Sequence, residues 1–397
     1  MISIDRALEL VLGGLEPLGA ERAPLADAAG RVAAEPALSA VDLPPFDRSA
    51  MDGYVVRAAD TAPGVPLRLA GGVAAGEVAT AELEPGTAAR VSTGAAIPKG
   101  ADAVLQSELA EERNGAVTPA RAIDVGRHIR FRGEDLHAGA VLAEAGARLT
   151  LPKISALASA GVGDVAVHRR PRLDLIVTGS ELLPLGAPPE PGRIHESNGL
   201  MVGLLAARAG AVVNDHGVVG DDREATIAAV EEGLAGDVLV VSGGVSVGPH
   251  DHVKPAFEQC GVDEVFWRVS IKPGKPLWFG RRDRTLVFGL PGNPLSTIVC
   301  FSVFIAPALR RLGGEREARP RYEAGRLTVP ARASDGRTEY LTAALRPGAD
   351  GVLEATPTER QGSHMTGALG ESDGFAIAPE DAGELPAGAP VDVLRLD

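Results

Sequence analysis

The chain has 397 residues, more than a single hydrophobic core accommodates, so we expect about two to four domains. Its formal net charge of -14 at pH 7 argues against nucleic-acid binding, because contact with the phosphate backbone requires a basic surface. We find no apolar run of the roughly 18 residues that cross a bilayer, and the acidic N-terminal segment does not resemble a signal sequence. We therefore expect a cytoplasmic protein without membrane contact.

The first part of the chain combines helical and β-type patterns. Apolar residues recur at helical spacing over 4–18, with Ser3 placed as the cap of this helix. Between 42 and 133, short β-type runs such as 88–91 are separated by glycine and proline. A second helix begins at Pro152. These patterns predict a small β domain inserted into a discontinuous N-terminal one.

From Arg172 onward, apolar runs alternate with helical segments. This alternation predicts a mostly parallel sheet with helices on both faces. The segment 294–312 is apolar almost throughout and is expected to form a buried helix. Short runs with turn residues then predict a second small β domain near the C-terminus. The sequence thus predicts a multidomain α/β fold around a central, mostly parallel α/β domain.

Three glycine- and proline-rich loops follow apolar, strand-like runs in the central domain. The runs cover 238–241, 265–271 and 285–290, and the loops after them read SGGVSVGPHD, KPGKP and PGNPLS. Glycines at the carboxyl ends of strands expose backbone N–H groups where ligands of α/β sheets bind. The charged and polar residues of these loops are Ser242, Ser246, Asp251, Lys272, Lys275, Asn293 and Ser296. The loops therefore indicate a site for a phosphorylated ligand, although three tight turns are the simpler alternative.

Carboxylates also follow three strands of the predicted sheet. They are Glu181, Asp251 and one of the pair Asp221 and Asp222. Oxygen ligands beside phosphate-binding loops suit Mg²⁺, which bridges one or two carboxylates to phosphate oxygens. Metal-assisted attack on a phosphate centre is the chemistry that follows. The alternative is that these carboxylates cap helices, as aspartate commonly does.

Two further segments lie far from these loops in the sequence. The segment PPFDRSAMDGY contains Asp52 in a compact turn, and STGAAIPKGADAV contains Thr93 after a strand-like run. Taken alone, either segment could be a capped turn, because short polar side chains in turns often bond their own backbone.

The motifs of this chain, taken in order, resemble those of the molybdopterin molybdenumtransferase or MoeA family, to which the E domain of gephyrin is related. The matching segments read PPFDRSAMDGY, TGAAIPKGADAV, RGEDL, TGSEL, GRIHESNG, SGGVSVGPHD, KPGKP, GLPGNPLS and QGSH. The resemblance implies four domains, the last of them β-barrel-like. We expect their bounds at 1–42 plus 134–168, 43–133, 169–315 and 316–397.

The family resemblance also implies an activity and an assembly. The activity is insertion of molybdate into adenylylated molybdopterin with release of AMP, which places a molybdopterin adenylyltransferase upstream. The assembly is an elongated homodimer whose active cleft lies between the α/β domain of one subunit and the inserted β domain of the other.

The site residues that the resemblance implies fall into three groups. Asp251 would position metal or water at the phosphoanhydride, supported by Glu181 and by Asp221 or Asp222. The candidate Mg²⁺ ligands are therefore Glu181, Asp221, Asp222 and Asp251. Asp52 and Thr93 would act from across the dimer interface. The residues expected to bind molybdopterin, molybdate or phosphate are Ser242, Gly243, Gly244, Ser246, Lys272, Lys275, Pro291, Asn293, Pro294, Ser296 and Ser363.

This sequence departs from the family pattern at two positions that matter for the site. Ser180 stands where the family commonly has aspartate, and Thr342 stands where we align an anion-binding arginine. Arg337 lies five residues before Thr342, a distance of roughly 16 Å along a strand, and we do not expect it to substitute. Oxyanion affinity is therefore expected to differ.

Two other functions share parts of this pattern. Molybdopterin adenylyltransferases share the α/β domain, and the gephyrin relative also serves as a scaffold for receptor peptides. The flanking domains favour insertion over adenylylation, and the polar residues at the strand ends favour catalysis over a scaffold. The preference between molybdate and tungstate stays open.

Overall fold

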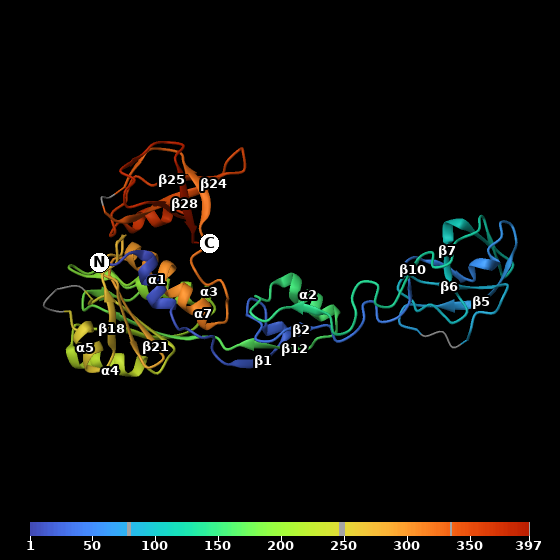
Figure 1. Cartoon of the computed structure of the whole chain (residues 1–397), viewed down its shortest axis with the longest axis horizontal. Coiled ribbons are helices and arrows are strands. Elements are labelled where there is room, and N and C mark those ends of the chain that lie inside the picture. The colour runs from blue at the N-terminus through green and yellow to red at the C-terminus, as the bar shows by residue number, and fades with distance from the viewer. Residues whose placement is uncertain (78–80, 246–250, 334–335, 397) are drawn as a thin grey trace.

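A computed structural model of the chain describes residues 1–77, 81–245, 251–333 and 336–396. Figure 1 shows an elongated molecule in which the α/β domain and the C-terminal β domain share one end. A small unit lies in the middle, and the inserted β domain forms the other end. The multidomain α/β fold predicted from the sequence is confirmed, whereas the bounds given for its four domains stay a prediction.

The α/β domain is built on a six-stranded sheet in the order β16-β13-β17-β21-β20-β18. Its first four strands run parallel, and β20 is antiparallel to both of its neighbours. The strands are β13 (Arg172–Thr178), β16 (Val212–Val219), β17 (Val238–Ser242), β18 (Asp263–Trp267), β20 (Trp278–Arg282) and β21 (Thr285–Leu290). The central strands are almost wholly apolar because helices cover both of their faces.

Each face of this sheet packs against its own set of helices. Val238 and Val240 of β17 belong to the core under α1, α3 and the helical segment Pro294–Leu312. Leu239 and Val241 point the other way, into the core under α4 and α5. The helices are α1 (Ile4–Leu12), α3 (Asn198–Arg208), α4 (Arg223–Gly233) and α5 (Val253–Gln259). Ser3 caps α1 as predicted, because its side chain accepts a hydrogen bond from the backbone N–H of Arg6.

The apolar segment Pro294–Leu312 is helical throughout and belongs to this core. It consists of α6 (Pro294–Cys300), a π-helical turn (Phe301–Ile305) and α7 (Ala306–Leu312). Our count of apolar runs was wrong here, because the segment has 19 residues and is apolar enough to cross a membrane. However, 83% of its 18-residue window is buried inside the protein. A helix covered in this way is a core helix.

The C-terminal domain is a closed five-stranded barrel, as expected. Its strands follow the order β24-β25-β22-β28-β26, and β26 pairs again with β24 to close the ring. They are β22 (Glu323–Leu327), β24 (Thr338–Pro347), β25 (Leu353–Pro357), β26 (Gly374–Ala378) and β28 (Pro390–Arg395). Tyr340 and Phe375 join the core of the α/β domain, which fixes the barrel against it.

The middle unit is formed by two segments that are distant in the sequence. β1 (Ala20–Pro24) pairs with β12 (Asp164–His168), and β2 (Ala37–Leu38) pairs with β11 (Val141–Ala143). Helix α2 (Leu151–Ser159) packs on them. The discontinuous N-terminal domain is therefore real, although α1 leaves it and packs on the α/β domain.

The inserted β domain contains a six-stranded sheet in the order β7-β4-β6-β5-β9-β8. A short pair of strands, β3 and β10, lies beside it. The strands are β3 (Arg48–Ser49), β4 (Gly53–Val56), β5 (Leu67–Val73), β6 (Thr87–Val91), β7 (Ala103–Gln106), β8 (Ala110–Arg113), β9 (Ala116–Pro119) and β10 (Ile129–Arg130). Among the residues that the structure describes, its cores contain none from the α/β domain.

One predicted strand is divided between two domains. The run 265–271 was expected to be a single strand, but β18 ends at Trp267 and Arg268 turns with φ of +75°. The chain then forms β19 (Ile271–Lys272), which pairs with β24 of the barrel. The KPGKP loop therefore follows a strand of the barrel, not a strand of the α/β sheet.

Shortening Phe288 to alanine is expected to lower the free energy of unfolding of the α/β domain by about 3–5 kcal/mol. Phe288 is fully buried and packs against Phe279, with the ring centroids 4.8 Å apart and the rings tilted by 35°. Urea unfolding followed by tryptophan fluorescence measures this domain selectively, because Trp267 and Trp278 are the only tryptophans of the chain. Leu200→Ala is the control, since Leu200 is 51% exposed and should change stability by less than about 0.5 kcal/mol. Equal losses in both variants would contradict this assignment of the core.

Candidate functional site

The parallel strands β13, β17 and β21 end at one edge of the sheet, and a cavity of about 630 Å³ opens there. Four carboxylates line it, those of Glu181, Glu196, Asp221 and Asp251, and we call it the carboxylate pocket. The predicted residues that it brings together are Glu181, Asp221, Ser242, Gly243, Gly244, Asp251, Asn293 and Pro294. Ser246 lies outside the described residues.

Two glycines allow the loop after β17 to pass close to the neighbouring strand. Gly243 has φ of +100° and Gly244 has φ of +62°. A Cβ atom on Gly243 would lie 2.7 Å from Thr178 Oγ1, and one on Gly244 would lie 2.6 Å from Val253 Cγ2. Both the backbone angle and the space therefore require glycine, and the exposed backbone here can face a ligand.

Asn198 joins the ends of two strands, and our sequence reasoning missed it. Its Nδ2 donates to Ser242 Oγ at 3.0 Å and to the carbonyl of Gly292 at 2.8 Å. Asn198 is the first residue of α3 and is 8% exposed. It therefore holds the loop after β17 against the loop after β21. The GRIHESNG motif, which contains it, was the available signal.

The adjacent residues Asp221 and Asp222 have separate tasks. Asp222 is the N-cap of α4, because its Oδ1 accepts from the N–H of Ala225 at 2.8 Å. Asp221 instead lines the carboxylate pocket and exchanges two hydrogen bonds with Ser180. The Ser180 N–H donates to Asp221 Oδ2 at 3.2 Å, and the Asp221 N–H donates to Ser180 Oγ at 2.8 Å. Of the two aspartates expected at the site, Asp221 is therefore the one that lines the pocket.

Asp251 has a cation nearby. Burial lowers the pKa of the Lys254 ammonium group, and the charge of Asp251 opposes this shift. Lys254 Nζ lies 3.2 Å from the centroid of the Trp267 ring, which also favours its charged form.

The carboxylates of this pocket are not arranged as a metal-binding cluster. Within the described ranges, no group of three or more histidine, cysteine, aspartate or glutamate side chains is arranged to hold a metal ion. Asp222 is used at a helix end, so the expected four-carboxylate set is not assembled. Mg²⁺, however, usually takes only one or two protein carboxylates and completes its shell with water and substrate phosphate. The pocket carboxylates therefore fit a Mg²⁺ ion that takes one or two of them and completes its shell with water and substrate phosphate.

A second cavity of about 510 Å³ adjoins the carboxylate pocket, and we call it the lysine pocket. Asn293 lines both cavities, and its Nδ2 donates to Ser363 Oγ at 3.1 Å. The predicted residues that line the lysine pocket are Lys272, Lys275, Pro291, Asn293, Ser296 and Ser363. The α/β domain and the barrel therefore build this pocket together.

Lys272 is held by a carboxylate of the barrel. Its Nζ lies 2.8 Å from Oε1 of Glu339, which is only 4% exposed. β19 and β24 are paired at these two residues, so the ion pair and the strand pairing support each other. Lys272 is thus fixed in place, whereas Lys275 is exposed at the same pocket.

Arg337 lines the lysine pocket, contrary to our expectation. β24 begins at Thr338, and Arg337 lies in the bend before it. The distance counted from Thr342 does not decide the place of Arg337, because Thr342 is not among the residues that line this pocket. Thr342, in contrast, is fully buried. Its Oγ1 lies 2.7 Å from Thr358 Oγ1 and 3.1 Å from Gln361 Oε1, so it anchors the loop that carries Ser363.

Asp52 and Thr93 contact each other but do not reach either pocket. The backbone N–H of Thr93 donates to Asp52 Oδ1 at 2.8 Å. Both residues belong to the inserted β domain, which Figure 1 places at the far end of the molecule from the α/β domain. Neither residue lines the carboxylate or the lysine pocket of its own chain.

Comparison with known proteins covers nearly the whole chain. Three family models match it: the MoeA N-terminal region (domain I and II) at residues 2–161, a probable molybdopterin binding domain at 174–311, and the MoeA C-terminal region (domain IV) at 324–396. The molybdopterin molybdenumtransferase of Haemophilus influenzae is 34% identical over 99% of this chain and 98% of its own. That of Bacillus subtilis is 34% identical over 100% of this chain and 94% of its own.

The fold is also that of a solved structure. The crystal structure of a molybdopterin biosynthesis MoeA protein from Pyrococcus horikoshii superposes with a TM-score of 0.85 at 33% identity. The similarity covers 100% of this chain and 99% of that one. The similarity therefore extends to all domains and is not restricted to the α/β domain.

The different tasks of Asp221 and Asp222 predict different effects on stability. Asp222→Ala removes the cap of α4 and should lower the free energy of unfolding by about 1 kcal/mol. Asp221→Asn keeps an oxygen that can accept from Ser180, so we expect a change below about 0.5 kcal/mol. Urea unfolding followed by the fluorescence of Trp267 and Trp278 compares the two variants. A larger loss for Asp221→Asn would show that the tasks are assigned the wrong way round.

Proposed function

Because the chain belongs to the MoeA family of molybdopterin molybdenumtransferases, we propose that it inserts molybdate into adenylylated molybdopterin and releases AMP. The observation that carries this proposal is the pair of adjoining cavities, one lined by carboxylates and one by cations, that share Asn293. The substrate would come from a molybdopterin adenylyltransferase in the cytoplasm.

The carboxylate pocket suits the phosphoanhydride. Gly243 and Gly244 expose backbone at the edge of the sheet, where anionic groups of ligands bind. Asp251 is the side chain proposed to orient the water that attacks phosphorus and to accept its proton, with AMP as the leaving group. Mg²⁺, held by Glu181, Asp221 or Asp251 together with phosphate oxygens, would neutralise charge on the phosphates. Ser180 supports this arrangement by fixing Asp221.

The lysine pocket suits a tetrahedral oxyanion. Lys272, Lys275 and Arg337 supply positive charge, and Ser296 and Ser363 supply hydroxyl donors. Glu339 neutralises part of the charge of Lys272, so Lys275 and Arg337 are the cations left for the anion. Arg337 thereby takes the part that the family pattern gives to an arginine at the position of Thr342.

A complete site needs a second copy of the chain. Asp52 and Thr93 are joined to each other but lie in the inserted β domain, remote from both pockets of their own subunit. The proposed homodimer would bring this pair to the α/β domain of the partner subunit. Two-fold symmetry would then create two equal active sites, each built from both subunits.

Replacing cations of the lysine pocket is expected to weaken use of molybdate without removing the hydrolytic step. Lys275→Ala and Arg337→Ala should each raise the molybdate concentration for half-maximal AMP release about tenfold, because each removes a charged hydrogen-bond donor. Asp251→Asn should instead reduce the rate of AMP release by at least about 100-fold at saturating molybdate. Rapid-quench measurement of AMP gives both quantities.

Arg172→Ala is the matched control, since Arg172 is exposed and lies at the opposite edge of the sheet. An unchanged molybdate dependence in Lys275→Ala would remove Lys275 from the anion site. Normal AMP release by Asp251→Asn would refute the role given to Asp251.

Subunit mixing tests whether the active site is shared. Asp52→Ala and Asp251→Asn homodimers should both be inactive, but a randomised mixture should regain about a quarter of wild-type activity, because half of the dimers are mixed and each has one intact site. The measurement is AMP release after the two variants are dissociated and reassociated together. If the mixture stays as inactive as its components, each site is formed within one subunit.

A further inference from the structure

A strongly basic cavity lies at the opposite edge of the α/β sheet from the two pockets. It is lined by residues 29–32, Arg148, 168–171, 207–210, Arg310, Gly313 and Glu315. Six of these residues are arginines, namely Arg31, Arg148, Arg169, Arg170, Arg208 and Arg310. We call it the arginine pocket. Such a concentration of positive charge is unexpected in a chain with a net charge of -14.

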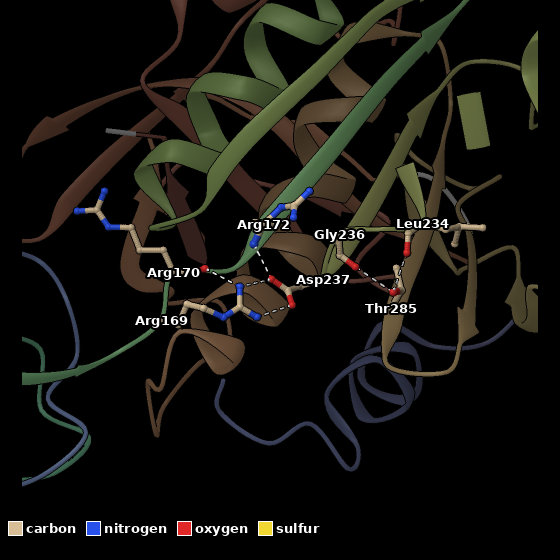
Figure 2. Close-up of polar contacts among 7 residues, drawn as sticks. All are labelled: Arg169, Arg170, Arg172, Leu234, Gly236, Asp237 and Thr285. Carbon is tan, nitrogen blue, oxygen red and sulfur yellow. Dashed lines mark hydrogen bonds and ion pairs between the residues drawn. The ribbon is translucent and has the colours of Figure 1, made fainter. Parts of the chain in front are cut away.

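Some of these arginines are neutralised by carboxylates. Arg169 forms a bidentate pair with Asp237 at 2.8 and 3.0 Å, as Figure 2 shows. Arg31 is paired with Glu21. These contacts explain the positions of two of the six arginines without any ligand.

Glu315 is the carboxylate that lines the pocket itself, and it is shared. Its Oε1 lies 2.7 Å from Nη1 of Arg148, and its Oε2 lies 3.4 Å from Nη2 of Arg321, which is outside the pocket. The charge of Glu315 opposes the lowering of the Arg310 pKa by burial. Arg310 does not, however, form a hydrogen bond or ion pair with any described side chain. One shared carboxylate therefore does not balance the arginines around it.

The remaining balance of charge is positive. Three carboxylates, those of Glu21, Asp237 and Glu315, oppose the six arginines. The ends of α3 and α7 also face the pocket, and each helix C-terminus is equivalent to about half a negative charge. A surplus of about two positive charges is left.

In the described part of the chain, the side chains of Arg170 and Arg310 have no acceptor. The side chain of Arg170 is exposed, and Figure 2 shows it directed away from the Asp237 carboxylate that holds Arg169. Arg310 is partly buried, and burial lowers the pKa of its guanidinium group. A charge that has lost part of its hydration without gaining an acceptor is unfavourable, and a bound anion would compensate it.

The size of the pocket limits the ligand. Its volume is about 150 Å³. Pockets for drug-sized ligands measure roughly 300–1,000 Å³, so a nucleotide or a pterin does not fit. The space is large enough for one small oxyanion.

We propose that the arginine pocket binds one divalent tetrahedral oxyanion of the phosphate and sulfate class, at a site separate from the two pockets of the active site. Its walls come from both sides of a junction. Residues 29–32 and Arg148 belong to the middle unit, whereas 207–210 and Arg310 belong to the α/β domain. A bound anion therefore ties the two units together and stiffens the base from which the inserted β domain extends.

Isothermal titration calorimetry with inorganic sulfate, at ionic strength held constant with sodium chloride, tests this proposal on the full chain. We expect saturable binding that Arg170→Ala weakens about tenfold, because one charged donor is lost. Arg172→Ala should leave the affinity unchanged, since Arg172 is a neighbouring exposed arginine that does not line the pocket. Arg310→Met is the second pocket variant, with folding checked by tryptophan fluorescence.

Lys275→Ala separates this site from the lysine pocket and should retain the sulfate binding that Arg170→Ala loses. Equal weakening by Arg170→Ala and Arg172→Ala would indicate a general charge effect and overturn the proposal. Loss of binding only in Lys275→Ala would place the anion in the lysine pocket, and absence of saturable binding would exclude the site. A titration with inorganic phosphate and one with molybdate then rank the members of the oxyanion class.

Discussion

The whole site depends on the parallel pairing of β13, β17 and β21. Parallel strands bring their carboxyl ends to one edge, so loops that are more than 100 residues apart in the sequence meet there. Gly243 and Gly244 then let the chain pass where a side chain would collide. The buried apolar core on both faces of the sheet holds this edge rigid. A shift of one residue in the register of β17 would reverse its faces and move Ser242 away from Asn198.

The barrel completes the site by closing the lysine pocket. Strand β19 leaves the α/β domain to pair with β24, and the Lys272–Glu339 ion pair lies at that junction. Thr342 and Gln361 hold the loop that presents Ser363 to Asn293. The barrel therefore supports the wall of the lysine pocket in addition to supplying residues that line it. The arrangement also explains why a cation at Arg337, at the bend before β24, can face the same cavity as Lys275.

Patterns along the sequence predicted the parts of the fold that local chemistry decides. The alternation of apolar runs with helical segments predicted the α/β sheet, and the cap residue Ser3 predicted the start of α1. Contacts between distant residues were beyond such patterns. Nothing local distinguishes Asp221 from Asp222, and only the start of α4 shows which one is the cap. The place of Arg337 was not foreseen because its distance was counted from Thr342, which does not line the lysine pocket. Asn198 was missed because its partners, Ser242 and Gly292, are remote in sequence.

We propose that the two adjoining pockets couple cleavage of the phosphoanhydride to capture of molybdate. Single-turnover release of AMP from adenylylated molybdopterin by the purified protein, with Mg²⁺ present and molybdate titrated against tungstate, tests it most directly. We expect AMP release to rise with molybdate to saturation and to yield active molybdenum cofactor. Tight binding of adenylylated molybdopterin without AMP release at any molybdate concentration would contradict it.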